Sequence, residues 1–150
     1  MNYFEEINLP IFDKDIFFKE LIKLHPLMKD RTFLAKGWKS IDLIKEFEAE
    51  KILITCPIVL EWLLNQKYKT VYVAILEAEG YIDWHVDQQK EQMSKAINLY
   101  IKTTSMSYIE FIDGFMWHPK SGKAYKFRED IKHRVKNPTK ELRMVMNLFI

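Results

Sequence analysis

The second half of the chain is a series of short apolar segments separated by turn-forming residues, and this pattern constrains the fold more than any other feature. Residues 70–76 are β-branched, aromatic or apolar on both faces, which predicts a strand buried between two layers. Further strands are predicted at 96–102, 107–112, 115–117, 123–127 and 142–150, with turn signals at Asp113-Gly114 and at Pro119 to Gly122. Several short strands joined by turns predict a β-sandwich or a β-barrel.

Residues 96–102 alternate along the predicted strand, so their side chains divide into two faces. Ile97, Leu99 and Ile101 share the apolar face. We interpret that face as packing against an outer core. Asn98 and Tyr100 would then face a cavity, where they could hydrogen-bond a co-substrate. A surface-facing Asn98 and Tyr100 is the alternative.

The last predicted strand, 142–150, alternates in the same way. Its two faces consist of Leu142, Met144, Met146 and Leu148, and of Arg143, Val145, Asn147 and Phe149. Arg143 therefore lies on a partly apolar strand face. It is either an exposed arginine on an edge strand or an inward-pointing arginine in the mouth of a barrel.

The first third of the chain predicts helices. Asp13 can cap a helix that runs to about His25, because Pro26 disfavours helix at the residue before it. A second helix is predicted over 41–47, capped by Ser40, and a third begins after Pro57. We therefore expect a mainly β protein with N-terminal helices, an α+β chain.

The expected organisation is a single domain over 1–150. Residues 1–66 would form a mainly helical support and residues 70–150 a β core. With only four glycines, a glycine-rich phosphate loop is not expected. The single cysteine, Cys56, excludes an intramolecular disulfide and a cysteine-based zinc site, and we interpret it as a small buried residue.

No apolar run is long enough to span a membrane, and we expect no membrane partner. The first six residues lack the basic and then apolar layout of a signal peptide. The expected location is cytoplasmic. The sequence assigns no oligomeric state.

Two histidines and an aspartate offer a metal site. His85 and Asp87 are two residues apart, so on an extended chain both side chains emerge from the same face. His133 would have to arrive from a distant strand. Two imidazoles and one carboxylate are the facial triad that holds non-haem Fe(II) and leaves positions open. In a chain with four histidines, the His85/Asp87 pair alone is weak evidence for a metal site.

The order of several motifs resembles the Fe(II)/2-oxoglutarate-dependent dioxygenases. The matching residues are His85-x-Asp87, then Gly122-Lys123 with Phe127, then His133-x-Val135-x-Asn137, and finally Arg143. Within that superfamily the chain is most similar to the aspartyl/asparaginyl β-hydroxylase-like branch, which includes amino-acid proline hydroxylases. The resemblance covers roughly residues 55–150.

The resemblance implies a double-stranded β-helix, a jelly-roll and cupin-like core, flanked by helices. It implies that His85, Asp87 and His133 form the catalytic iron site. Arg143 would bind the distal carboxylate of 2-oxoglutarate. The implied cofactors are Fe(II) and 2-oxoglutarate, with ascorbate as a supporting reductant. The implied activity is hydroxylation of an amino-acid residue in a peptide or protein, or of a free amino acid.

Two other functions are open at this point. One is a catalytically inactive, cupin-like binding protein that has kept the barrel. The other is an oxygenase acting on nucleic acid, because basic residues crowd one region. They are Lys120, Lys123, Lys126, Arg128, Lys132, Arg134, Lys136 and Lys140. Lysines on outer strand faces are commonly solvated and protect sheet edges.

Four further side chains have competing roles. Trp84 and Trp117 either line a substrate pocket or pack in the core. His118 is a competing metal ligand, ranked below His133 because it has no partner two residues on. His25 is interpreted as structural.

Asn137 and the segment 88–95 also have two readings each. Asn137 recurs in the resembling family and precedes a proline, so we interpret it as a structural turn former. The polar segment 88–95 is either a lid over the site or a solvated loop.

Overall fold

The computed structural model describes residues 2–32, 34–87 and 93–150 of the chain. The strands are β1 (Phe4–Ile7), β2 (Lys29–Asp30), β3 (Ala35–Lys45), β4 (Glu48–Ala49), β5 (Thr70–His85), β6 (Ile97–Lys102), β7 (Tyr108–Phe111), β8 (Met116–Trp117), β9 (Lys123–Phe127), β10 (His133–Lys136) and β11 (Arg143–Phe149). The helices are α1 (Lys14–Leu21), η1 (Ile22–Leu27), η2 (Lys51–Thr55) and α2 (Pro57–Leu64). All the strands predicted in the second half are present, and β10 joins them.

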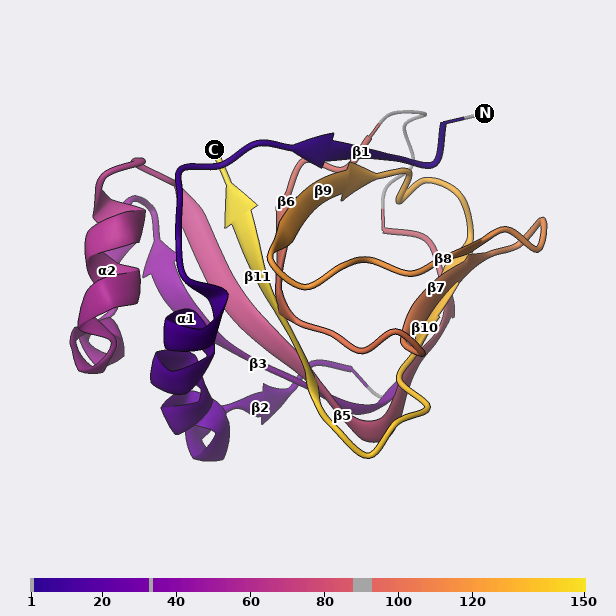
Figure 1. Ribbon diagram of the computed structural model, residues 1–150, viewed down its shortest axis with the longest axis horizontal. Helices are drawn as coiled ribbons and strands as arrows, with labels where there is room; N and C mark the ends of the chain where they lie inside the picture. Colours follow the sequence, from indigo (N-terminus) through magenta and orange to yellow (C-terminus); the bar gives the residue numbers. More distant parts are fainter. Residues whose placement is uncertain (1, 33, 88–92) are drawn as a thin grey trace.

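Strand β5 belongs to both walls of a curled antiparallel sheet. Its first half, Thr70–Leu76, pairs with β11, and its second half, Tyr81–His85, pairs with β10. The first wall therefore consists of β3, the first half of β5, β11, β6, β9 and β1, and the second wall of the rest of β5 with β10, β7 and β8. Figure 1 shows the sheet curling around a central space. This arrangement is the predicted jelly roll.

Strand β5 continues through Glu79-Gly80, although its backbone is irregular there. Glu79 has a φ of 60°, and the pairing register with β3 shifts between Lys36 and Trp38. A Cβ on Gly80 would lie 2.7 Å from the carbonyl oxygen of Lys36, so only glycine fits this close approach.

Asn137 stabilises the connection between the end of β10 and the start of β11. Its amide nitrogen donates to the carbonyls of Leu76, Glu77 and Glu141, at 2.7–3.2 Å. Its oxygen accepts hydrogen bonds from the Ser107 hydroxyl and from Thr139. The side chain is fully buried. The structural role predicted for Asn137 is confirmed.

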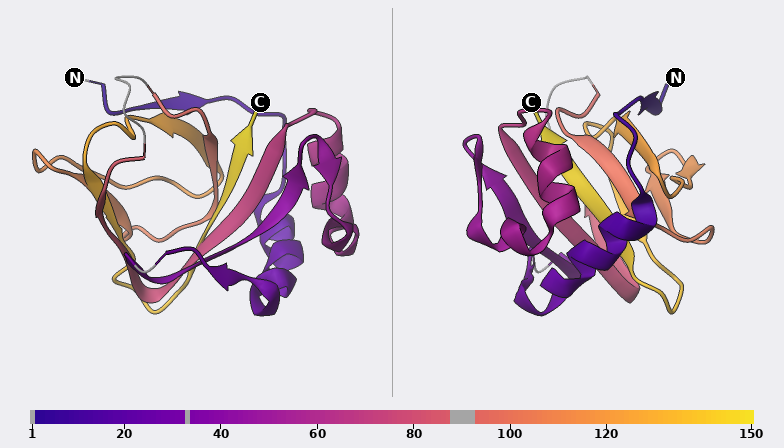
Figure 2. Two further views of the ribbon diagram at one scale, coloured as in Figure 1. Left: turned by 180° about the vertical axis from the view of Figure 1, so that it is seen from behind. Right: turned by 60° about the vertical axis from the view of Figure 1, so that its left-hand side comes forward.

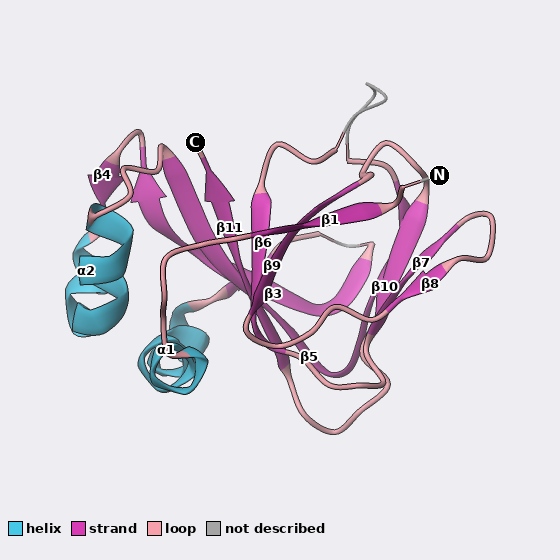
Figure 3. Cartoon of the chain, turned by 45° about the horizontal axis from the view of Figure 1, so that its top comes forward, coloured by secondary structure: helices cyan, strands magenta, loops and turns pink. Residues whose placement is uncertain are grey.

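The helices cover the outer face of the first wall, as Figures 2 and 3 show. The outer core lies between them and contains side chains from α1, α2, β5, β6 and β11, including Phe17, Leu63, Ile75, Leu99 and Met146. A separate inner core, which includes Phe111, Trp117 and Val135, lies inside the jelly roll. No helix among the described residues is long and apolar enough to cross a membrane.

Both α-helices begin where the sequence predicted. The Asp13 carboxylate accepts hydrogen bonds from two backbone N–H groups of the first turn of α1, and Pro57 is the first residue of α2. Glu20 joins the helices, because its carboxylate accepts from the N–H groups of Ile58 and Val59. Cys56 lies beside this contact, fully buried, and its thiol donates to the Glu20 carbonyl. Cys56 is the small buried residue that was expected.

The helix predicted over 41–47 was wrong, because these residues lie in β3 and in the turn that follows it. Residues 35–44 of β3 pair along β5, and this long edge outweighs the local helix propensity. Glu46 and Phe47 form a two-residue turn with φ of 46° and 68° that joins β3 to β4. A hairpin turn of this kind usually contains asparagine or glycine, so Glu46 and Phe47 do not indicate a turn. The first third is therefore a mixture of helices and strands.

Candidate metal centre

Three candidate metal ligands converge where β5 and β10 meet. His85 ends β5, His133 begins β10, and the two residues pair directly across the antiparallel strands. Asp87 lies two residues beyond His85, and its backbone N–H donates to the carbonyl of Glu129 at 3.1 Å. One ligand atom from each of the three side chains lies within 4.8 Å of the other two. The three residues suggested by the sequence are thus brought together.

Hydrogen bonds to the backbone determine which imidazole nitrogens are available. Nδ1 of His85 lies 2.6 Å from the carbonyl oxygen of Asp83, and Nδ1 of His133 lies 2.7 Å from that of Ile131. A carbonyl oxygen only accepts, so each Nδ1 carries a proton and donates it. Both Nε2 atoms face Oδ2 of Asp87, at 3.4 and 3.2 Å. Metal-ligating histidines make this same use of their second ring nitrogen.

The electrostatics of the three side chains favour positive charge between them. Burial opposes the charge of Asp87, but hydrogen bonds with His133 and His85 outweigh it and hold the pKa of Asp87 well below its usual range. Burial also acts to lower the pKa of His85, yet the hydrogen bonds to Asp87 and to the Asp83 carbonyl raise it overall. A divalent cation bound through both Nε2 atoms and Oδ2 would supply this positive charge. The donor set fits Fe(II).

Arg143 lies on the first wall and lines the same cavity as the metal ligands. The residue is 7% exposed, and its Nε and Nη1 have no hydrogen-bond partner among the described residues. Burial lowers the pKa of Arg143, but a guanidinium remains charged at neutral pH. Its Cζ lies 5.5 Å from the ring centroid of Tyr100. A buried guanidinium with unpaired N–H groups is destabilising unless an anion binds it.

The cavity has a volume of about 360 Å³, and its floor is polar. Asn98 on β6 pairs directly with Asn147 on β11, and both are buried. The Asn98 amide donates only to two carbonyls at 3.4 Å, and the Asn147 amide has no hydrogen bond with any described residue. Tyr100 lies beside them, and burial raises its pKa to about 12, so its hydroxyl is a neutral donor. Asn98 and Tyr100 face the cavity as predicted, while their binding roles stay predictions.

The two tryptophans considered for the pocket lie elsewhere. Trp117 is buried in the inner core, where its ring stacks on Phe4 with centroids 4.5 Å apart. The guanidinium of Arg134 lies over the ring of Trp84, with its Cζ 4.7 Å from the ring centroid. Neither lines the cavity. Trp117 therefore packs in the core, and Trp84 makes a cation–π contact with Arg134.

The other two histidines lie outside the group of metal ligands. Nδ1 of His118 is 3.0 Å from the carbonyl oxygen of Ser107. Nε2 of His25 lies 3.2 Å from the carboxylate of Glu77. Among the described histidines, only His85 and His133 therefore lie in the group of three side chains that could bind one metal ion.

The basic residues around β9 and β10 are partly neutralised. Arg128 pairs with Asp130 at 2.7 Å, Arg134 pairs with Glu110 at 2.7 Å, and Lys123 lies 3.8 Å from Glu6. These pairs reduce the positive charge that a nucleic-acid backbone would meet. Of the segment 88–95 considered as a lid, residues 88–92 lie outside the described residues.

Sequence reasoning missed four side chains that line the cavity. Arg31, Trp38 and Tyr72 gather where β3 pairs with β5, and Glu129 lies beside the metal ligands. Burial, together with the charge of Asp87, raises the pKa of Glu129 to about 8. Tyr72 lies in a predicted strand, but the strand that carries Trp38 was not predicted at all. The missing signal was therefore the pairing of β3 with β5.

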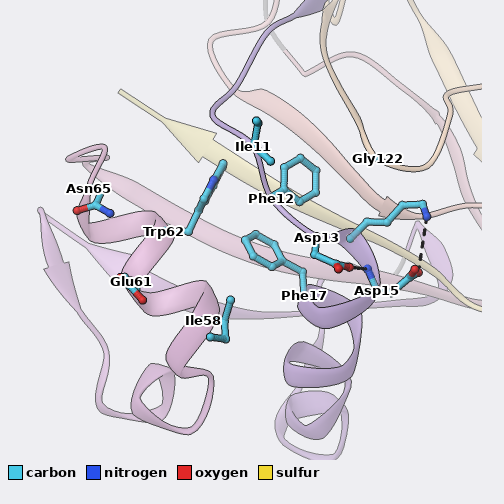
Figure 4. A pocket seen from close by; sticks show the side chains of 11 residues that line it. Ile11, Phe12, Asp13, Asp15, Phe17, Ile58, Glu61, Trp62, Asn65 and Gly122 are labelled. Carbon is cyan, nitrogen blue, oxygen red and sulfur yellow. Dashed lines mark hydrogen bonds and ion pairs between the residues drawn. The ribbon is translucent and has the colours of Figure 1, made fainter.

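A larger, open hollow of about 770 Å³ lies among α1, α2 and the segment that leads into α1 (Figure 4). Its apolar part includes Phe12, Phe17 and Trp62, whose rings pack against one another. The hollow shares no lining residue with the cavity of the metal ligands. The cavity, which holds the metal-ligand group and the unpaired arginine, is the candidate functional site.

No protein-family model matches this sequence, and no curated protein matches it significantly. The solved structures that share the fold include three prolyl hydroxylases. Viral collagen prolyl hydroxylase from Paramecium bursaria Chlorella virus-1, in its 2-oxoglutarate complex, is 16% identical with a TM-score of 0.59, over 97% of this chain and 93% of that chain. A Pseudomonas putida prolyl-4-hydroxylase is 15% identical with a TM-score of 0.59, over 99% and 92%. A Trichoplax adhaerens prolyl hydroxylase, in complex with a hypoxia-inducible-factor peptide fragment, is 15% identical with a TM-score of 0.61, over 99% and 84%.

These likenesses extend over nearly the whole chain, so they include the helices as well as the jelly roll. At such low identity they show the fold alone. The chain therefore has the fold of 2-oxoglutarate- and iron-dependent oxygenases, mainly prolyl hydroxylases, and its own side chains must support any statement about chemistry.

Proposed function

We propose that this protein is an Fe(II)- and 2-oxoglutarate-dependent dioxygenase that hydroxylates an amino-acid residue in a peptide or protein, or a free amino acid. One observation carries the proposal. The buried guanidinium of Arg143 lines the same cavity as His85, Asp87 and His133, and its Nε and Nη1 are unpaired within the described part of the chain. A metal site alone suits many proteins, whereas a metal site beside an unpaired buried arginine suits a co-substrate with a carboxylate.

Different residues of the chain would bind the metal and the co-substrate. His85, Asp87 and His133 would hold Fe(II), and Arg143 would bind the distal carboxylate of 2-oxoglutarate through its guanidinium fork. The Tyr100 hydroxyl would donate to the same carboxylate. When bound, Fe(II) supplies the oxygen chemistry that turns O₂, 2-oxoglutarate and a C–H bond into succinate, CO₂ and a hydroxylated product.

The comparisons support the choice of substrate class. Three of the structural neighbours are prolyl hydroxylases, and one of these is in complex with a peptide fragment. The narrower assignment, to the aspartyl/asparaginyl β-hydroxylase-like branch, rests on the order of sequence motifs alone and remains a prediction.

Anaerobic titration with Fe(II) tests the metal site. The wild-type protein should bind one Fe(II) per chain and gain about 2.7 kcal/mol in its free energy of unfolding at a free metal concentration 100 times Kd. His85→Ala should abolish both the binding and the stabilisation, because only two of the three protein ligands remain. His118→Ala is the matched control and should behave like wild type. Equal binding by His85→Ala and wild type would overturn the metal site.

Binding of 2-oxoglutarate tests Arg143. Arg143→Ala should weaken 2-oxoglutarate binding about 10- to 100-fold, the effect of losing a charge-assisted hydrogen bond, and leave Fe(II) binding intact. Arg134→Ala, on the outer side of β10, is the control. A protein that binds both ligands and yet never forms succinate would instead be the inactive, cupin-like binding protein.

A further inference from the structure

Three ionisable side chains in the cavity are left over after the metal and the co-substrate have been assigned. They are Arg31, Lys95 and Glu129, and all three line the same space as the metal ligands. None of them is needed to hold Fe(II) or 2-oxoglutarate in the proposed function, on which this inference rests. The guanidinium of Arg31 has no carboxylate partner, and the carboxyl group of Glu129 has no cationic partner, among the described residues. Such a site is suited to a ligand that carries both an anionic and a cationic group.

Arg31 is held in place although it is accessible to solvent. Its Cζ lies 4.3 Å from the ring centroid of Tyr72 and 5.0 Å from that of Trp38. Its Nη1 donates to the hydroxyl of Ser40 at 2.9 Å. No described carboxylate pairs with it. These three contacts fix a long side chain before a ligand arrives, which reduces the entropy lost on binding.

Glu129 also lines the cavity and lies next to the metal ligand Asp87. Its backbone carbonyl accepts the N–H of Asp87, which fixes the position of the residue. Its carboxylate accepts no hydrogen bond from any described residue, in contrast to the neighbouring Asp130, which pairs with Arg128. The carboxylate is therefore available to a ligand that brings donors of its own.

Tyr72 lines the same cavity as Arg31 and Glu129. Its ring supports the Arg31 guanidinium, and both residues lie in the cavity that contains the metal ligands.

We propose that the substrate is a small zwitterion, a free α-amino acid, whose carboxylate pairs with Arg31 and whose ammonium group pairs with Glu129. Trp38 and Tyr72 form the apolar side of the carboxylate subsite. A residue inside a peptide carries neither charge, so it would leave both side chains unmatched. A cavity of about 360 Å³, close to the lower limit for ligand sites, also suits a small substrate.

Calorimetric titration of the protein loaded with Fe(II) and 2-oxoglutarate, without oxygen, tests this pairing. The ligands are the common free L-amino acids and, for each that binds, its N-acetyl derivative and its amide. Removal of either ligand charge should weaken binding of the wild-type protein about 10- to 100-fold. If a peptide-embedded residue binds and no free amino acid does, the inference fails while the proposed function stands.

Two variants separate a role in recognition from a role in packing. Arg31→Gln should bind the free acid and the amide equally, and Glu129→Gln should bind the free amino acid and its N-acetyl derivative equally. A merely structural residue would weaken all these ligands by the same factor. Lys69→Gln, an exposed charge that does not line the cavity, is the control.

Two outcomes would overturn the assignment of residues. Loss of Fe(II) binding in Glu129→Gln would mean that Glu129 serves the metal instead. Lys95 also lines the cavity, so loss of discrimination against the amide in Lys95→Gln, and not in Arg31→Gln, would transfer the carboxylate to Lys95. If wild-type protein binds neither Fe(II) nor 2-oxoglutarate, the earlier titrations will already have refuted the proposed function.

Discussion

The two faces of strands β6 and β11 differ in what their side chains touch. On the outer face, Leu99 and Met146 are completely buried against the helices. On the inner face, Asn147 and Arg143 are almost as deeply buried, but their polar groups have few or no partners. Both faces share one set of backbone hydrogen bonds. The outer face therefore stabilises the fold, whereas the polar groups of the inner face are available to bind ligands.

Substitution of neighbouring residues on opposite faces should give the largest contrast. Met146→Ala should lower the free energy of unfolding by about 2–5 kcal/mol, because it leaves a cavity in the outer core. Asn147→Ala should change it by about 0.5 kcal/mol or less, since no described partner is lost. Urea unfolding of both variants measures the difference. Equal losses would show that the inner face also stabilises the ligand-free protein.

Replacement of the inner-face charge should have a smaller effect, with the opposite sign. Arg143→Met removes an unpaired buried guanidinium and keeps the apolar length of the side chain, so the ligand-free protein should gain about 1–3 kcal/mol. Arg134→Met, which breaks an ion pair outside the cavity, should instead lose about 1 kcal/mol or less. A loss of stability in Arg143→Met would mean that its contact with Tyr100 outweighs the burial of the charge.

Local pattern was enough to predict the strands of both faces. The alternation in 96–102 and 142–150 separated Leu99 from Asn98 and Met146 from Asn147. The structure buries Leu99 and Met146 in the outer core, and of the two positions left open for Asn98 it has the one that lines the cavity. Strand β3 was missed because its stability comes from pairing with β5, which is remote in sequence. Its closing turn at Glu46-Phe47 also lacks the usual residues.

The same distinction between local pattern and long-range pairing applies to the candidate site. Residue type and order were enough to suggest His85, Asp87, His133 and Arg143. The backbone acceptors of the histidines, and the positions of Arg31 and Glu129, depend on distances between segments that no local pattern encodes. Trp38 and Arg143 illustrate this, since both pair with Leu76, from opposite edges of β5.

A pH dependence of stability is also predicted to arise on the inner face. Burial and the charge of Asp87 raise the pKa of Glu129 to about 8, from about 4.3 in an unfolded chain. The folded protein then binds more protons than the unfolded protein between these values, so stability falls as pH rises from about 4.3 to 8. The raised pKa of His85 acts in the same direction near neutral pH. Asp87, with its lowered pKa, acts oppositely and only in acid.

Urea unfolding of the metal-free protein between pH 5 and 9, in the presence of a chelator, measures this slope. Glu129→Gln should flatten the slope, because the glutamine has no proton to lose, whereas Glu61→Gln on the exposed side of α2 should leave it unchanged. A slope that survives in Glu129→Gln would assign the effect to His85. No slope in the wild type would mean that water enters the inner face freely, and the contrast between the two faces would then be one of packing alone.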